Sequence, residues 1–288
     1  MASQWQNFQR NLGAWRGSFT NVDAHGRELE CSASLLTLSS ADEGRAVHFR
    51  LRRSASGDPV AAPSQDTAQE YRTLGKQVVF FDNGSFSKGS LQIAPATRFG
   101  AEYGFISGDR RHRLVQLFAD DGTFSSLVLI REFRDGSGAT ERPPLSLEQL
   151  GGRWQGQAAT IEADWPEPTL VDASIAVDQP DAASLRLETR LGPESTVVVA
   201  RPVADAAGPW YSADGLSGDA ASDAGQAGRL LLLPDGGLSL APLQISHRQG
   251  FRVEAGWLES PHRWQRLIRR YGPRGEWLSS THLLARRI

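Results

Sequence analysis

Two acidic residues, Glu102 and Glu254, lie at equivalent places within otherwise apolar segments. Each is followed by a glycine two residues later and by an aromatic residue, Phe105 or Trp257, three residues later. If the apolar neighbours of Glu254 face the core, strand alternation places Glu254 and Arg252 on the opposite face, either solvated or salt-bridged across strands. Alternatively, Glu254 points into a barrel with an arginine of the last hairpin, and the pair orients a polar ligand. The candidate ligand-binding residues are therefore Arg252, Glu254, Trp257 and Glu102.

The C-terminal segment from Pro261 to Ile288 has the clearest local charge asymmetry of the chain. It contains seven arginines and one acid, Glu276. One interpretation is a solvated sheet face. The other is a docking surface for an acidic protein partner, with Trp264, Tyr271 and Trp277 as anchors. The candidate partner-binding residues are Arg263, Arg266, Arg269, Arg270 and Arg274.

Catalytic motifs give no support for enzymatic chemistry. Cys31 is the only cysteine and the six histidines are scattered, so we expect no intramolecular disulfide and no metal site. Glycine-rich nucleotide-binding loops, zinc-protease motifs and nucleophile elbows are absent from the sequence. We therefore expect no catalytic residues and no cofactor, and an enzyme is the less favoured class.

The composition is that of an ordinary globular protein. Hydrophobic residues make up 40% and charged residues 22%, and 31 basic against 33 acidic residues give a net charge of -2. This balance argues against nucleic acid as a partner. The N-terminal segment lacks the apolar stretch of a signal peptide, and no apolar run is long enough to cross a bilayer. We expect a cytoplasmic protein that does not insert into a membrane.

The chain contains an internal repeat. The pattern Gly-x-Trp-x-Gly occurs at 13–17 and again at 152–156, an offset of 139. Three further pairs of segments match at an offset of 152, namely 83–87 with 235–239, 91–93 with 243–245, and 99–106 with 251–258. A shared offset across separated segments is stronger evidence than any one match, and it predicts two halves with the same fold.

The increase in offset places extra residues in the second half. The segment Ala204 to Gly228 is rich in Ala, Gly, Asp and Ser and predicts a flexible surface loop, which we expect Trp210 and Tyr211 to anchor. The run from Asp135 to Pro144 resembles a linker. It places the domain boundary near residue 140, giving domains 1–140 and 141–288.

Short β-rich runs bounded by turn residues predict an antiparallel meander in each half. Helix is expected only in the N-terminal segment, where Trp5, Phe8 and Leu12 share one face, and around 146–150. Closure of each meander into a barrel would remove its exposed edges. The predicted fold class is all-β, with two tandem antiparallel β-barrels related by the internal repeat and a short N-terminal helix.

The Gly-x-Trp at the start of each meander, together with an arginine on its last strand, resembles the lipocalin and wider calycin signature. The glycine lets the entering chain bend, while the arginine can stack on the indole and donate to backbone carbonyls. The resemblance implies that both barrels are lipocalin-like and that these residues close them structurally. They are Gly13, Trp15 and Arg131 in the first half and Gly152, Trp154 and Arg286 in the second.

Several longer segments resemble DUF3598, a cyanobacterial and plastid family of lipocalin-like proteins of unknown function. The segments are 5–8, 11–19, 256–258, 265–271 and 275–277, and the similarity spans nearly the whole chain. The family is similar to the chloroplast two-barrel biogenesis factor required for ATP synthase. The resemblance implies a protein of a photosynthetic organism with a chaperone-like, non-enzymatic assembly role, whose partners are subunits of the ATP synthase catalytic head.

The fold also resembles S-type phycobilin lyases, which attach bilins to phycobiliproteins. Here the equivalent site would be Glu254 with an arginine of the last hairpin, although those lyases are single barrels. This resemblance implies an alternative function, in which a barrel cavity binds a hydrophobic or tetrapyrrole ligand such as a bilin, with or without lyase activity toward a phycobiliprotein. We rank the assembly factor first, the ligand carrier second and the lyase third.

Overall fold

Alternating runs separated by turn residues form antiparallel strands through most of the chain, as predicted. The structure is a computed structural model that describes residues 2–55, 57–181, 184–203, 210–216 and 226–288. The strands form two sheets, one in each half of the sequence, so the all-β prediction with two barrel-like sheets is confirmed. No helix among the described residues has both the length and the apolar character needed to span a bilayer.

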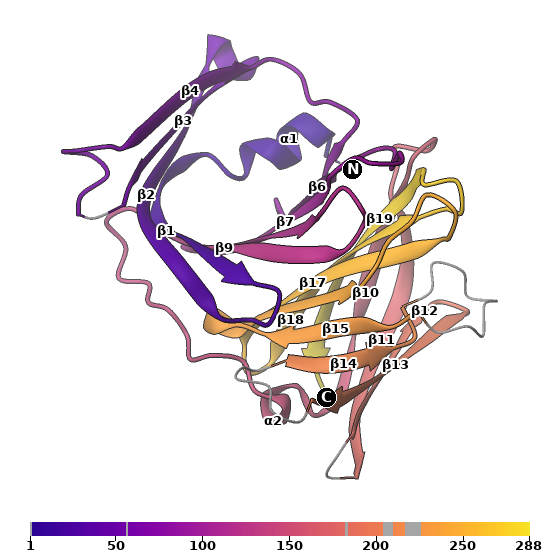
Figure 1. The fold of residues 1–288 in the computed structure, drawn as a ribbon. Helices are drawn as coiled ribbons and strands as arrows, with labels where there is room; N and C mark the ends of the chain where they lie inside the picture. The colour runs from indigo at the N-terminus through magenta and orange to yellow at the C-terminus, as the bar shows by residue number, and fades with distance from the viewer. Residues whose placement is uncertain (1, 56, 182–183, 204–209, 217–225) are drawn as a thin grey trace.

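The first half forms a nine-stranded sheet in the order β4-β3-β2-β1-β9-β8-β7-β6-β5, which curls around α1 (Figure 1). The short helix is α1 (Gln4–Gln9), whose first turn is closed by a capping box between Ser3 and Gln6. Its Phe8 packs inside the sheet against Phe80 and Tyr71. The strands are β1 (Gly13–Asp23), β2 (Glu28–Ala41), β3 (Ala46–Ser54), β4 (Gln65–Tyr71), β5 (Val78–Phe80), β6 (Phe86–Gly89), β7 (Phe99–Ser107), β8 (Arg110–Phe118) and β9 (Phe124–Arg134), with a single 3-10 turn η1 (Asp42–Gly44).

The second half forms a closed ten-stranded barrel in sequence order. The helix α2 (Leu147–Leu150) precedes it, and the 3-10 turn η2 (Pro234–Gly236) lies within it. The strands are β10 (Gly152–Glu162), β11 (Thr169–Asp181), β12 (Ser184–Leu191), β13 (Glu194–Pro202), β14 (Trp210–Asp214), β15 (Gly228–Leu232), β16 (Gly237–Pro242), β17 (Phe251–Ser260), β18 (Arg263–Tyr271) and β19 (Trp277–Arg287).

The segment predicted as a flexible loop contains a strand of the barrel. Trp210–Asp214 forms β14, which pairs with β13 on one side and with β15 on the other. Trp210 packs against the hydrophobic core between the halves, and the Arg229 guanidinium lies 4.4 Å from its ring centroid. The loop prediction is therefore wrong for β14, while residues 204–209 and 217–225 lie outside the described residues. The extra residues of the second half supply an extra strand.

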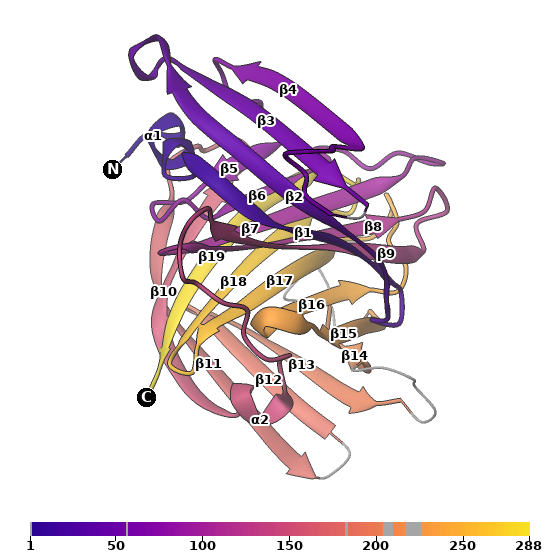
Figure 2. The same cartoon turned by 90° about the vertical axis from the view of Figure 1, so that its left-hand side faces the viewer.

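The two halves pack sheet against sheet, with β6, β7 and β8 lying against β18, β17 and β16 (Figure 2). One continuous apolar cluster fills the space between them. Within it the Trp257 ring stacks on His112 with 5.8 Å between ring centroids, and the Trp257 indole donates to the carbonyl of Asp235 at 2.9 Å. Burial of one face of each sheet against the other half therefore adds a third core, outside the interiors of the two sheets.

His282 lies at this interface, with its ring 5.2 Å from that of Phe81 between centroids and its Nε2 2.9 Å from the side-chain oxygen of Gln265. Burial lowers the pKa of His282 from 6.5 to about 4. The unfolded chain therefore takes up this proton first as the pH falls, and the stability present above pH 6.5 is lost on the way to pH 4. We expect this group to contribute a loss of about 3 kcal/mol in the free energy of unfolding over that window.

Urea denaturation between pH 7 and pH 4 measures this effect. The variant His282→Gln should show a shallower loss of stability than the unmodified chain, whereas His262→Gln, at an exposed position, should follow the unmodified chain. Parallel curves for the unmodified chain and His282→Gln would contradict the prediction.

The predicted arginine–tryptophan contact is present in both halves, but it uses different arginines. Arg134 lies 4.3 Å from the ring centroid of Trp15, and Arg287 lies 4.2 Å from that of Trp154. The reason is register, because Trp15 is paired with Arg134 across β1 and β9, and Trp154 with Arg287 across β10 and β19. Residues paired across antiparallel strands share one face of the sheet.

The two arginines predicted for this contact, Arg131 and Arg286, do not stack on the tryptophans. Arg131 donates to Glu141 at 2.7 Å and to Thr20 at 2.9 Å, and Arg286 is exposed. Arg134 and Arg287 also donate to backbone carbonyls near the start of each half, those of Leu12 and of Gln149 and Gly151. Each arginine therefore fixes the entering chain to the last strand.

We expect Arg287→Ala to lower the free energy of unfolding by about 2 kcal/mol, because it removes a stacked cation and leaves two carbonyls without their donor. The neighbouring change Arg286→Ala should stay within about 0.5 kcal/mol, as for other exposed positions. Urea denaturation of the two variants side by side measures the difference. Equal losses would contradict the assignment of this role to Arg287.

Candidate functional site

An ion pair between a glutamate and an arginine is repeated inside both sheets. On β7 and β17, the even-numbered positions face the interior of their own sheet, while the odd-numbered residues face the other half. Glu102 thus lies inside the first sheet and Glu254 inside the barrel. The arginine partner in each half is the residue paired with the glycine two positions after the glutamate, Arg113 opposite Gly104 and Arg266 opposite Gly256. The repeat therefore preserves the pair together with its register.

In the barrel the pair is fully buried. The Arg266 guanidinium donates to the Glu254 carboxylate and, at 2.5 Å, to the hydroxyl of Thr189, while Nε of Arg252 lies 3.2 Å from the second carboxylate oxygen. Burial by itself raises the pKa of Glu254, but the charges of Arg266 and Arg252 outweigh it and hold the pKa below its ordinary value. Glu254 is therefore an ionised carboxylate between two guanidinium groups.

A cavity of about 230 Å³ lies beside this triad inside the barrel. Its wall combines the guanidinium groups of Arg252 and Arg270 with hydroxyl groups, including those of Thr160 and Thr281, which hydrogen-bond each other at 2.8 Å. Drug-sized ligand pockets usually occupy roughly 300 to 1,000 Å³. The barrel cavity is thus small and polar, and most of the barrel interior is filled by side chains.

In the first sheet the equivalent pair belongs to a larger charged cluster. Nη1 of Arg113 donates to Glu102 at 2.9 Å, and its Nε donates to Glu132 at 3.2 Å. Arg111 forms an ion pair with the same Glu132 at 3.2 Å and lies against the Trp15 ring. Within the described part of the chain the buried Nε and Nη1 of Arg111 have no hydrogen-bond acceptor. Burial lowers the pKa of Arg111 to about 10.

Glu102, Arg111 and Arg113 line a cavity of about 400 Å³, which is larger than the cavity of the barrel. Leucine and phenylalanine side chains of β2 and β3 form its apolar wall, and Gln65, Thr67 and Gln69 of β4 line its polar side. The cavity lies where β4 and β5, the two ends of the sheet order, fail to pair. The first half therefore has a larger interior cavity than the closed barrel.

The structure separates two of the residues that the sequence placed in one ligand site. Arg252 and Glu254 lie together beside the barrel cavity, but Trp257 faces the opposite side of β17 and packs between the halves. Glu102 lies in the cavity of the first sheet. Of the alternatives for Glu254, exposure to solvent is wrong, and the structure has the buried side chain pointing into the barrel and paired with Arg266 of the C-terminal segment. Its role in ligand binding stays a prediction.

The five arginines proposed as a partner surface do not share a surface. Arg266 and Arg269 are buried, the first inside the barrel and the second between the halves, where it donates to Ser87. Arg270 borders the barrel cavity, Arg263 is the first residue of β18, and Arg274 lies beyond the other end of that strand. The physical reason for this correction is that both faces of β18 are buried. One face packs into the interior of the barrel, and the other packs against the first half.

Three residues of the charged cluster inside the first sheet were missed by the sequence analysis, namely Arg111, Arg113 and Glu132. The repeat contained a signal for Arg113, because it follows Glu102 across a hairpin as Arg266 follows Glu254. Among the described residues no group of histidine, cysteine or acidic side chains is arranged to hold a metal ion.

Two family models match consecutive parts of the chain. Residues 1–137 match the domain of unknown function DUF3598, N-terminal, and residues 141–288 match the C-terminal domain of biogenesis factor required for ATP synthase 1. No curated protein matches the chain in sequence.

Two solved structures are similar to the chain. A DUF3598 protein of unknown function from Nostoc punctiforme PCC 73102 is 35% identical over 100% of both chains, with a TM-score of 0.88. An S-type phycobiliprotein lyase from Guillardia theta is 14% identical, covering 49% of this chain and 90% of the lyase, with a TM-score of 0.35. The second similarity is too low to inform on function.

Proposed function

The chain belongs to the DUF3598 family, and we propose that it is a non-enzymatic assembly factor that binds subunits of the ATP synthase catalytic head. The observation that carries the proposal is the match of residues 141–288 to the C-terminal domain of a biogenesis factor required for ATP synthase. We place this role in the cytoplasm.

The interior of the C-terminal barrel supports a protein-binding role over a ligand-binding one. Its charged groups Glu254, Arg266 and Arg252 are bound to one another, and its cavity is below the usual size for an organic ligand. The C-terminal half would then bind its protein partner through the outer surface of the barrel. Buried ion pairs of this kind specify packing as readily as they bind ligands.

Binding to purified catalytic-head subunits tests the proposed function. The tagged full chain is mixed with the subunits singly and as the assembled head, and each mixture is analysed by size-exclusion chromatography. We expect co-elution with at least one subunit and no co-elution of an unrelated β-barrel protein of similar mass. Absence of a complex with every subunit and with the assembled head would overturn the proposal.

A second candidate function, binding of an apolar ligand that carries a carboxylate, is favoured by Arg111. Its guanidinium is buried and borders the cavity of the first sheet, and its Nη1 has no acceptor among the described residues. A carboxylate is the natural acceptor for such a group. Bilins and other tetrapyrroles combine an apolar body with carboxylates, and this candidate includes transfer of a bilin to a phycobiliprotein.

Titration with biliverdin tests the second candidate. Saturable changes in its visible absorption near one equivalent, weakened in Arg111→Leu, would support this candidate. An unchanged spectrum at all ratios would exclude tetrapyrroles as ligands of this cavity.

A further inference from the structure

The first half is one strand short of the second, and the missing strand falls at a defined place. Around the closed barrel the order β10 to β19 matches β1 to β9 of the first sheet, with β14 as the one strand that has no counterpart. Residues 72–77 connect β4 to β5 directly, whereas residues 203–227 connect β13 to β15 and include β14. The unpaired position in the first sheet therefore corresponds to the position of β14.

We propose that an extended segment of a partner protein adds as a strand along the free edge of β4, in the position that β14 occupies in the barrel. This inference rests on the proposed function and names the site on this chain where the partner binds. Strand addition to an exposed edge is a recurrent mode of peptide recognition, in which backbone hydrogen bonds supply affinity and alternate side chains supply specificity.

The edge of β4 is available for pairing. Among the described residues β4 pairs only with β3, and all seven of its residues are exposed or half-buried with no backbone partner on the other side. The strand contains no proline or lysine, two of the residues that commonly protect such edges, and its two acids, Asp66 and Glu70, are paired with Arg50 and Arg72. Its unpaired N–H and C=O groups are therefore free to accept a further strand.

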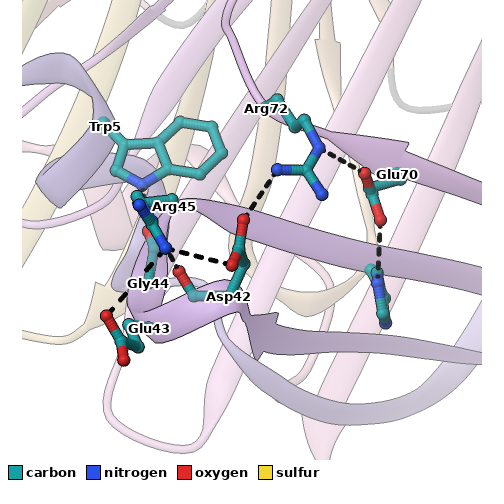
Figure 3. Close-up of polar contacts among 8 residues, drawn as sticks. Trp5, Asp42, Glu43, Gly44, Arg45, Glu70 and Arg72 are labelled. Carbon is teal, nitrogen blue, oxygen red and sulfur yellow. Dashed lines mark hydrogen bonds and ion pairs between the residues drawn. The ribbon is translucent and has the colours of Figure 1, made fainter.

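The end of β4 is nevertheless held in place, so that the edge is preorganised. Arg72, directly after the strand, donates to Glu70 at 2.6 Å and to Asp42 at 2.8 Å, which lies in the turn between β2 and β3 (Figure 3). The same turn accepts a hydrogen bond from the Trp5 indole at the Gly44 carbonyl, 2.6 Å away. These contacts tie β4 to the turn and to α1, which lowers the entropic cost of pairing.

The opposite edge, that of β5, is already covered. The backbone N–H of Phe80 donates to the side chain of Gln4 at 2.7 Å, and the same side chain donates back to the Phe80 carbonyl at 3.0 Å. Gln4 thus takes the place of a neighbouring strand at this residue. The incoming segment is therefore expected to pair with β4 and to lie over the cavity rather than bridge both edges.

The cavity beside β4 sets the chemistry of the incoming segment. Phe49, Leu51 and Tyr71 line it, so alternate residues of the segment should be apolar and point inward, with polar residues facing solvent. The repeat supplies the pattern, because Tyr211 of β14 packs toward the barrel core, as does Ala213, while Ser212 is exposed. A partner strand that alternates in this way would fill the apolar part of the cavity.

A second copy of the chain fits this position poorly. The β4 strand of another copy would already have its own β3 on one side. Pairing of the two β4 edges would join two sheets into one continuous sheet. It would not place a single strand over the cavity. A free segment of a different protein meets the geometry.

Hydrogen–deuterium exchange of the full chain, alone and with purified catalytic-head subunits, tests the inference. We expect the exchange of the β4 amides to slow by about tenfold or more in the complex, while the exchange of those of β13, its counterpart in the closed barrel, stays unchanged.

The double variant Thr67→Asp with Gln69→Asp, which adds charge to the cavity side of β4, should raise the Kd of the complex by about tenfold or more. The matched control, Gln155→Asp with Gln157→Asp on an exposed face of β10, should bind like the unmodified chain.

The outcomes separate this inference from the proposed function. A complex that leaves β4 unprotected and tolerates the double variant overturns the inference and keeps the function. Absence of any complex overturns the proposed function. In that case a synthetic peptide with the sequence Trp210–Asp214, added at millimolar concentration, tests the inference. Protection of the β4 amides by the peptide supports the inference, and no protection overturns it. Protection of the β4 amides that grows with the concentration of the chain alone would identify a second copy as the occupant and overturn the inference. Binding of a small ligand in the cavity without protection of β4 would also overturn it.

Discussion

Replacement of Gly156 by alanine is expected to lower the free energy of unfolding by about 3 kcal/mol or more. A Cβ atom at this position would overlap the carbonyl oxygen of Leu284 and lie 2.8 Å from the Cα of Ala285. Both atoms belong to the backbone of β19, so only separation of β10 from β19 would relieve the clash. Urea denaturation of Gly156→Ala measures the loss.

The same change in the first half should have a similar effect, because Gly17 meets β9 in the same way. A Cβ atom there would overlap the carbonyl oxygen of Arg131 and lie 2.9 Å from the Cα of Glu132. Gly138, with no atom within 4 Å of its added Cβ, provides the matched control, and Gly138→Ala should stay within about 0.5 kcal/mol. Losses as small as the control's at positions 17 and 156 would contradict the close approach of these strands.

These two glycines explain why the repeat could be recognised from the sequence. Gly17 and Gly156 are the last residues of the two Gly-x-Trp-x-Gly patterns, and each is required where the first and last strands of a half come together. The contact of Trp15 or Trp154 with an arginine was predictable for the same reason. Which arginine makes the contact depends on strand register, and the shifts from Arg131 to Arg134 and from Arg286 to Arg287 could not be resolved from the sequence.

The orientation of β17 could not be derived from its pattern, because both of its faces are buried. The apolar stripe that includes Val253 and Trp257 faces the other half, and the charged stripe of Arg252 and Glu254 faces the barrel. Alternation separates the two faces of a strand but does not say which one lies inside a barrel. The arginines of β18 were misplaced for the same reason, since a charge-rich strand resembles a solvated one unless its partners are known.

The composition of the extra segment concealed β14. Its many alanine, glycine, aspartate and serine residues are typical of loops, and the described strand within it is only five residues long. The change in repeat offset did locate the extra residues. Only the pairing of Trp210–Asp214 with β13 and β15 shows that they close the barrel, and the open edge of β4 becomes apparent through that comparison.

Removal of the Glu254 carboxylate is expected to destabilise the protein by about 3 to 5 kcal/mol, because Arg266 and Arg252 would remain buried without their counter-charge. The repeat-related change Glu102→Ala should cost about 1 kcal/mol or less. The side chain of Glu102 is 19% exposed, and Arg113 keeps its hydrogen bond to Glu132. Urea denaturation of Glu254→Ala and Glu102→Ala at neutral pH compares the two halves directly.

A triple variant determines whether the buried charges are needed for the fold. Replacing the ion triad by apolar residues, as Glu254→Leu with Arg266→Met and Arg252→Leu, removes every unpaired charge at once and should recover most of the stability lost in Glu254→Ala. Recovery of stability with unchanged binding to the catalytic head would assign the triad to packing of the barrel. Recovery of stability with loss of binding would show that the charged interior of this half takes part in function, and a Glu254→Ala variant as stable as the unmodified chain would contradict the buried triad itself.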